Sequence, residues 1–338
     1  MNRRLLVILV VIFSLIITGC ATSALEPQKS TQSDEEVPSK LTIALVYGIQ
    51  GDAFYITMEK GARAKAEELG VELVADGPSK WDPAVQTPIV DAMIAKGIDA
   101  LIAVPNDPQA MISPLQRAYE QGIPVLTTDQ YIGDGNYENG SVTFPLSVIA
   151  SDNYEGGKIA CTALIEAIGG EGSLYILTST ANVPSDIARR DGCIEAIDSV
   201  EGVTLVGVDY TESSAPIATN QTQAMLEKEP ELKAIFGANL FSAQGAAAAI
   251  KSAGLEGVVK IASFDAPEQA IIDLRNEVID MVIAQQPALI GSLAVQYAYD
   301  ALMGNTADIP AKVNTPFVVI TRDNVDTEEA QNAIYKSE

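Results

Sequence analysis

Residues 41–70 have the sequence LTIALVYGIQGDAFYITMEKGARAKAEELG, and this stretch decides the fold. It opens with an apolar run rich in β-branched residues, which predicts a buried strand. Asp52 follows at a position where its carboxylate can cap a helix, and apolar residues then recur at steps of three and four as far as Gly70. A strand, a turn and an amphipathic helix in this order indicate one unit of a βαβ fold.

The same alternation continues along the rest of the chain. The runs that predict further strands are VELVAD, DALIAVP, PVLTTD and SVIAS, and then SLYILT, VTLVGVDY, KAIFGAN, VKIASFD, IDMVIAQ and PFVVIT. Helical periodicity predicts helices near 87–96, 111–121, 154–168, 187–197, 219–226, 243–254, 267–276 and 287–303. The tail beyond Asp323 is expected to be peripheral. Two alternating sets indicate parallel sheets, whose strands are buried on both faces.

Length and composition agree with this organisation. The 338 residues exceed one ordinary domain of roughly 100 to 150 residues, so two lobes are expected. Lys and Arg number 21 against 45 for Asp and Glu, a net charge of −24. This balance argues against a nucleic-acid partner, because phosphate binding requires a basic surface. An acidic exterior also favours solubility, and we expect a monomer.

Catalytic machinery is not apparent in the sequence. Histidine is absent, which excludes Ser-His-Asp and Cys-His nucleophilic sites and His-ligated zinc. Phosphate-cradling, nucleophile-elbow and zincin motifs are also missing. We therefore expect no catalytic residue, no metal and no cofactor. Two carboxylates in one cleft can in principle serve a glycosidase, but a neighbouring arginine would keep them ionised, which disfavours that alternative.

The N-terminus, MNRRLLVILVVIFSLIITGC, has the layout of a secretory signal. Two arginines precede an apolar run that is shorter than the roughly 20 residues of a membrane-spanning helix. The string ITGC resembles the lipobox of bacterial lipoproteins, in which the signal is cut before the cysteine and the thiol receives lipid. We expect a signal peptide over 1–19, lipid on Cys20, and a polar, flexible tether over 20–40. A plain signal peptide with an incidental cysteine is the alternative.

Two further cysteines, Cys161 and Cys193, fall in expected helices of the second lobe. Outside the cytoplasm a disulfide between them would persist. Two buried free thiols are the other ordinary outcome, and the sequence does not decide between them.

Function is expected beyond the carboxyl ends of the strands, where parallel sheets present a crevice to ligands. Asp129 and Asp265 end two apolar strands and can each accept two hydrogen bonds. The amides there can donate and accept at once, and the guanidinium of Arg189 can bridge two adjacent hydroxyls. Aromatic side chains can lie against a sugar ring. The other candidates are Asp52, Phe54, Tyr55, Gln130, Asn239 and Gln285. Together they favour a neutral polyol.

Each candidate also has a purely structural interpretation. Asp52 can serve only as a helix cap, and Asp129 can serve only to stabilise a turn. Phe54 or Tyr55 can belong to the core, because adjacent helical residues point apart. Arg189 lies in a doublet with Arg190 and can be a solvated charge. Trp81 can simply cover a loop, so it is left out of the predicted site.

A family likeness is carried by several strings in chain order. They are AFYITMEKGA, PVLTTDQ, VIASDNYEGGKIA, ARRDGCIEAI, AIFGANLFSAQGA, SFDAPEQA and VIAQQP. From about Leu41 to Thr321 the chain resembles periplasmic sugar-binding proteins of the ribose-binding type. These proteins serve carbohydrate ABC transporters and share their fold with the ligand domains of LacI-type repressors.

The resemblance implies that all nine candidates bind the ligand. The position after Asp129 is commonly an arginine in the ribose-binding type and is Gln130 here, which puts ribose itself in doubt. The aromatic residue that the second lobe often contributes is not evident, because the matching stretch is TESSAPIA.

For the architecture, the resemblance implies the α/β fold of periplasmic binding proteins of type I, two Rossmann-like lobes with parallel sheets joined by three crossovers. The expected N-terminal lobe is 41–149 plus 286–313, the C-terminal lobe is 150–285 plus 314–325, and 326–338 form a C-terminal tail. The implied function is capture of a monosaccharide or polyol outside the cytoplasm and delivery to a permease, with membrane contact through the lipid only. The alternative is a lipoprotein sensor that presents a sugar, autoinducer or nucleoside to a chemoreceptor or sensor kinase.

Overall fold

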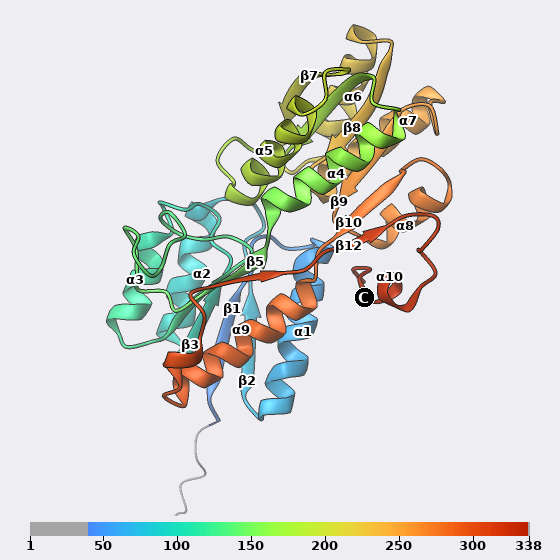
Figure 1. Cartoon of the computed structure of the whole chain (residues 1–338). Helices are drawn as coiled ribbons and strands as arrows, with labels where there is room; N and C mark the ends of the chain where they lie inside the picture. Colours follow the sequence, from blue (N-terminus) through green and yellow to red (C-terminus); the bar gives the residue numbers. More distant parts are fainter. Residues whose placement is uncertain (1–39, 337–338) are drawn as a thin grey trace, which may run out of the picture. The chain divides into compact units, whose positions relative to one another are not determined.

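The computed structural model describes residues 40–336 (Figure 1). The predicted signal peptide, the lipid site Cys20 and almost all of the predicted tether lie outside the described residues. In the described part, the chain forms two six-stranded sheets, which confirms the predicted α/β class. No helix in this part is both long and apolar enough to span a membrane.

The first sheet has the strand order β11-β5-β4-β3-β1-β2, and every pairing in it is parallel. Its strands are β1 (Thr42–Val46), β2 (Glu72–Asp76), β3 (Ala100–Ala103), β4 (Val125–Thr128), β5 (Val148–Ser151) and β11 (Lys312–Thr315). The helices packed on it are α1 (Ala53–Leu69), α2 (Pro83–Ala95), α3 (Ile112–Glu120) and α9 (Pro287–Leu302). We call this part the first lobe. Strand β11 was not expected from the sequence.

The second sheet has the order β12-β10-β9-β8-β6-β7 and is parallel except for β12, which runs antiparallel to β10. Its strands are β6 (Gly172–Thr178), β7 (Val203–Tyr210), β8 (Leu232–Gly237), β9 (Lys260–Phe264), β10 (Met281–Ala284) and β12 (Val318–Ile320). Its helices are α4 (Asn153–Ala167), α5 (Pro184–Asp198), α6 (Ala215–Lys228), α7 (Leu240–Ala253) and α8 (Glu268–Arg275). We call this part the second lobe; a short helix, α10 (Glu328–Asn332), follows β12.

The chain passes between the sheets after β5, after β10 and after β11. Strands β5 and β11 pair with each other as far as Ser151 and Thr315, so both belong wholly to the first sheet. The passages near Ala150 and Asn314 are thus made by residues just beyond these two strands.

Strand β1 shows why the apolar runs are continuous. Ile43 and Leu45 pack into a core cluster with residues of α1, whereas Ala44 and Val46 pack into a separate cluster with residues of α2 and α3. Because successive side chains of a strand point to opposite faces, a sheet covered on both faces needs apolar residues at every position.

Local signals fix the ends of the helices. Asp52 caps α1 by accepting a hydrogen bond of 2.8 Å from the backbone N–H of Phe54, and Gly70 ends this helix in the left-handed conformation at φ 70°. Helices α2 and α5 begin earlier than the sequence analysis expected, at Pro83 and Pro184. Proline suits the first helical turn because its missing N–H needs no partner there.

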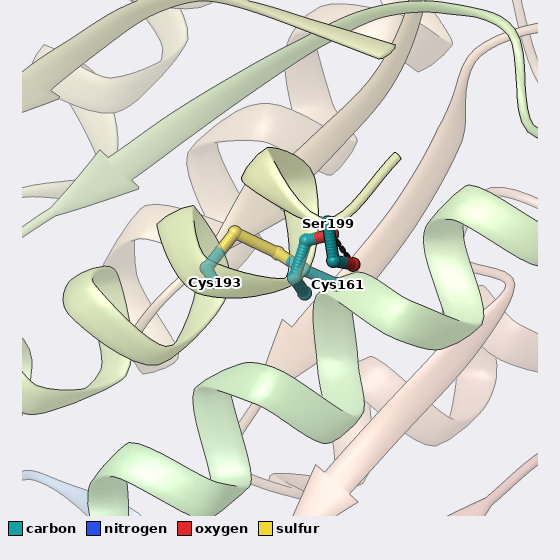
Figure 2. The surroundings of a disulfide bond; sticks show 4 residues. Cys161, Cys193 and Ser199 are labelled. Carbon is teal, nitrogen blue, oxygen red and sulfur yellow. Dashed lines mark hydrogen bonds between the residues drawn. A yellow bond between two sulfur atoms is a disulfide. The ribbon is translucent and has the colours of Figure 1, made fainter. Parts of the chain in front are cut away.

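A disulfide between Cys161 and Cys193 joins α4 to α5, as Figure 2 shows. The two Cα atoms are 5.1 Å apart, and both side chains are fully buried. The two helices can approach this closely because Gly157 and Gly192 have no side chain. A Cβ atom at Gly157 would collide with the backbone of Arg189, and one at Gly192 with the backbone of Tyr154. The bridge and the glycines therefore fix the helix pair that carries Arg189.

Candidate functional site

One cleft is lined by residues from both lobes. The first lobe contributes side chains from α1 and from the loops after β1, β2 and β4, and the second lobe contributes side chains after β6, β7, β8, β9 and β10. All nine residues expected at the ligand site line this cleft: Asp52, Phe54, Tyr55, Asp129, Gln130, Arg189, Asn239, Asp265 and Gln285. Their role in binding stays a prediction.

Asp129 and Asp265 occupy matching places in the two lobes. Each directly follows a central strand, β4 or β9, and each adopts the left-handed backbone conformation, with φ of 61° and 74°. Few residue types other than glycine tolerate this conformation, and aspartate is one of them. Sparsely populated backbone conformations of this kind concentrate at functional sites.

Asp129 accepts hydrogen bonds from the hydroxyl of Tyr55 at 2.8 Å and from Nε2 of Gln130 at 3.2 Å. Burial raises the pKa of the Asp129 carboxyl to about 6, while the positive charge of Arg189 and these two donors act in the opposite direction. Asp129 is therefore more than a turn residue, because a buried network of side chains converges on it.

Gln130 links the two lobes directly. Its Nε2 donates to Oγ of Ser185 at 2.6 Å, and its Oε1 accepts from the backbone N–H of Ser185 at 3.3 Å. Ser185 lies in the first turn of α5, and Val183 at the N-cap of that helix provides no side-chain cap. A residue of the first lobe thus satisfies an N–H at the start of a helix in the second lobe.

Arg189 is buried, with 3% of its surface exposed, so it is not a solvated surface charge. Its Nε donates to Oδ1 of Asn153 at 2.8 Å, and one terminal nitrogen donates to the carbonyl of Ala238 at 2.9 Å. The guanidinium lies 3.9 Å above the centre of the Phe264 ring and 4.0 Å from Asp265. These contacts hold the guanidinium at the cleft wall.

Asp186 is a cleft residue that the sequence analysis missed. It accepts from the backbone N–H of Ser179 at 2.9 Å and from Nδ2 of Asn239 at 3.0 Å, and it lies 3.4 Å from Arg189. Asn239 in turn caps α7 by accepting from the N–H of Ser242. The available signal was an acidic residue in a first helical turn, three positions before an arginine.

Asp265 and Gln285 form a second buried network. Nε2 of Gln285 donates to Oδ1 of Asp265 at 2.7 Å, whereas Oε1 of Gln285 has no hydrogen-bond partner in the described residues. Burial raises the pKa of Asp265, and Arg189 opposes this increase. A buried acceptor without a partner is costly, so this oxygen is well placed to receive a donor from a ligand.

An aromatic wall comes from the first lobe. The ring of Tyr55 meets Phe54 edge to face at 5.1 Å and stacks with Trp81 at 6.3 Å. Trp81, which the sequence analysis left out of the site, also lines the cleft. From the second lobe the cleft receives Phe241, two residues after Asn239, and Ser213 occupies the TESSAPIA stretch. Phe241 thus places an aromatic side chain of the second lobe at the cleft, whereas the TESSAPIA stretch contains none.

Asp52 combines both roles that the sequence offered, because it caps α1 and lines the cleft. Burial, and next the negative charge of Asp265, raise the pKa of Asp52 to about 7. The cleft is lined by the carboxyl groups of Asp52, Asp129, Asp186 and Asp265 against one guanidinium. Such a lining favours neutral hydroxyl donors over anions. The residues from 40 to 336 contain no cluster suited to hold a metal ion.

Two α/β lobes that enclose a polar cleft are the architecture of solute-binding proteins. A family model described as periplasmic binding protein domain matches residues 43–306, so the chain belongs to this family. The ribose import binding protein RbsB of Haemophilus influenzae is 30% identical over 83% of this chain and 91% of that protein. RbsB of Bacillus subtilis is 26% identical over 89% of this chain and 95% of that protein.

Solved structures that are similar to this chain are also solute-binding proteins. A solute-binding protein of an ABC transporter from Agrobacterium vitis, bound to α-D-tagatopyranose, is 39% identical, with a TM-score of 0.85 over 88% of this chain and 100% of that one. A second one from Agrobacterium vitis, with bound D-fucose, is 27% identical, with a TM-score of 0.81 over 87% of this chain and 100% of that one. The relatives are binding proteins for transport and not enzymes, which confirms the class predicted from the sequence.

Proposed function

We propose that this protein captures a neutral monosaccharide or a related polyol between its lobes outside the cytoplasm and delivers it to the permease of an ABC transporter. In this proposal a lipid on Cys20 is the only membrane contact, and the protein acts as a monomer. The observation that carries the proposal is the composition of the cleft. Buried acceptors, amides that both donate and accept, one guanidinium and aromatic side chains from both lobes match the donors, acceptors and apolar faces of a sugar.

Binding couples to closure because the two lobes supply different contacts. A sugar that touches both Asp129 and Asp265 stabilises the closed arrangement only through contacts that the open arrangement lacks. A micromolar affinity needs about 8 kcal/mol, which several hydrogen bonds to charged groups and one stacked ring can supply after ordering costs.

The sugar class follows from the charges. We infer a hexose, pentose or sugar alcohol without a carboxylate or phosphate, because an anion would meet the acidic lining described above. The relatives with bound tagatose and fucose support this class.

The single tryptophan provides a direct test. Trp81 is the only tryptophan of the chain and lines the cleft, so its emission reports on that site alone. We expect at least one of D-tagatose, D-fucose, D-allose, D-ribose and D-arabinose to change this emission saturably and to raise the melting temperature. D-Galacturonate, a matched anionic control, should do neither. A response to none of the neutral sugars, or to galacturonate alone, would contradict the proposal.

Replacing Asp265 by Ala should weaken binding of the best sugar of this panel at least about tenfold, the effect of losing one charged hydrogen-bond partner. Asp265→Asn should weaken it as well, and Asn tolerates the left-handed backbone better than Ala. Asp273→Ala is the matched control, since Asp273 is also a buried aspartate of the second lobe but does not line the cleft. Calorimetry measures the affinities. Equal affinities of Asp265→Ala and the wild type would contradict the assignment of Asp265 as a ligand-binding residue.

A further inference from the structure

The C-terminal tail, which the sequence analysis expected to be peripheral, reaches the back of the cleft. After β12 the chain forms α10, which packs against that strand and begins at a cap formed by Thr327 (Figure 1). Tyr335 then forms a parallel bridge with Pro267, and its backbone N–H donates to the carbonyl of Ala266 at 2.8 Å. The Tyr335 side chain is 1% exposed. This segment lies beyond residues 43–306, the part that matches the family model.

The hydroxyl of Tyr335 is built into the network around Asp265. It donates to Oδ1 of Asp265 at 3.1 Å and accepts from the backbone N–H of Gln285 at 2.8 Å. Gln285 directly follows β10, where the chain leaves the second sheet for α9 of the first lobe. One hydroxyl therefore fixes both a strand-end carboxylate and the backbone at a passage between the lobes.

The ring of Tyr335 contacts the opposite lobe. It meets the ring of Phe54 in α1 edge to face, with centroids 5.8 Å apart. Tyr335 itself does not line the cleft, whereas Phe54, Asp265 and Gln285 all do. The tyrosine thus touches three cleft residues from behind.

We infer that Tyr335 is a positioning residue of the ligand site, so that the C-terminal tail is a working part of that site. The inference rests on the sugar-binding function proposed above. Oδ1 of Asp265 receives both Tyr335 and Gln285, which leaves Oδ2, near Arg189, for the hydroxyls of a ligand. Without the phenol hydroxyl, Oδ1 loses a donor and the carboxylate loses a restraint on its orientation.

Tyr335→Phe isolates the hydroxyl, because it keeps the ring that packs on Phe54. We expect it to weaken binding of the best sugar of the panel about three- to tenfold, the range for one hydrogen bond of a positioned group. In an Asp265→Ala background, which leaves no side-chain oxygen for the hydroxyl to contact, the same change should cost less than about twofold.

Tyr137→Phe is the matched control. Tyr137 is also buried, and its hydroxyl also accepts from a backbone N–H and pairs with a side chain, those of Ile132 and Thr127, but it does not line the cleft. We expect it to lower stability without changing sugar affinity. If the role of Tyr335 were only structural, Tyr335→Phe would likewise lower stability without changing sugar affinity.

The pH dependence of binding is a readout that a structural role would not move. A donated hydrogen bond favours the ionised form of Asp265, so Tyr335→Phe should raise the pH at which sugar affinity begins to fall on acidification. The other titratable groups that act on Asp265 or respond to it, Arg189, Asp186, Asp52, Asp129 and Tyr55, are unchanged in the variant.

The possible results distinguish failure of the proposed sugar-binding function from failure of the role assigned to Tyr335. If the wild type binds no sugar of the panel, the proposed function fails and this inference fails with it. If the wild type binds and Asp265→Asn weakens binding, but Tyr335→Phe keeps wild-type affinity and pH dependence, only the role of Tyr335 is wrong. Weakening by Tyr335→Phe that disappears in the Asp265→Ala background supports the inference.

Discussion

Asp52→Asn is expected to stabilise the ligand-free protein at pH 8 by about 2 to 4 kcal/mol. Burial and the charge of Asp265 raise the pKa of Asp52 from 3.8 to about 7, and one pKa unit corresponds to about 1.4 kcal/mol. Because the pKa is higher in the folded state, the associated stability is present below pH 4 and lost as the pH rises toward 7. Asparagine removes the charge and keeps the helix cap, since it caps as well as aspartate.

Urea unfolding of both proteins at pH 4.5 and pH 8 measures this effect. Because pH 4.5 lies only slightly above the usual pKa of 3.8, the two proteins should differ by about 1 kcal/mol there and by more at pH 8. Asp82→Asn is the control, because Asp82 caps α2 through the same type of hydrogen bond, to Ala84, but at the surface. If Asp52→Asn gains no more at pH 8 than Asp82→Asn does, the carboxylate of Asp52 is not under electrostatic strain. The same variant should bind sugar more weakly, which would make Asp52 a residue retained for function at a cost in stability.

Removal of the disulfide by Cys161→Ala and Cys193→Ala together should lower the free energy of unfolding by about 3 to 4 kcal/mol. The bridge closes a loop with a sequence separation of 32 residues, and this is the loss that the chain-entropy account gives for such a loop. Both side chains are fully buried, so the alanines also leave a small unfilled volume.

Denaturant unfolding of the double variant, with wild type under reducing conditions as the control, tests this prediction. The reduced wild type should lose nearly as much stability as the double variant, because it keeps the sulfur atoms but not the covalent link. A loss below about 1 kcal/mol in both would show that the packing of α4 on α5, and not the bridge, fixes this helix pair.

Much of the fold was predictable because its signals are local. The alternation of apolar runs and helical periodicity, the cap at Asp52 and the stop at Gly70 act within a few residues of each other. The starts of α2 and α5 were predicted four and three residues too late, although Pro83 and Pro184 both suit a first helical turn. Strand β11, KVNT, has a largely exposed and polar sequence, and only its pairing with β5 makes it a strand.

The site residues also divide into those with a local signal in the sequence and those without one. Asp129, Asp265 and Asn239 could be placed because they directly follow apolar strands, whose carboxyl ends meet at one crevice. Tyr335 could not, because its contacts with Asp265 are made across 70 positions by a tail whose own sequence has no strand or long helix. Whether a glutamine at position 130 points to a ligand or to the other lobe is likewise set by docking of the lobes, which no local pattern encodes.

The two hydrogen bonds between Gln130 and Ser185 join the lobes without the help of a ligand. Together they contribute about 1 to 3 kcal/mol, enough to increase the population of the closed form severalfold to about a hundredfold in the absence of a sugar. Under the proposed function, a permease that recognises the closed form would then also be engaged by protein without a sugar, and this one amide would partly set the ATP turnover without cargo.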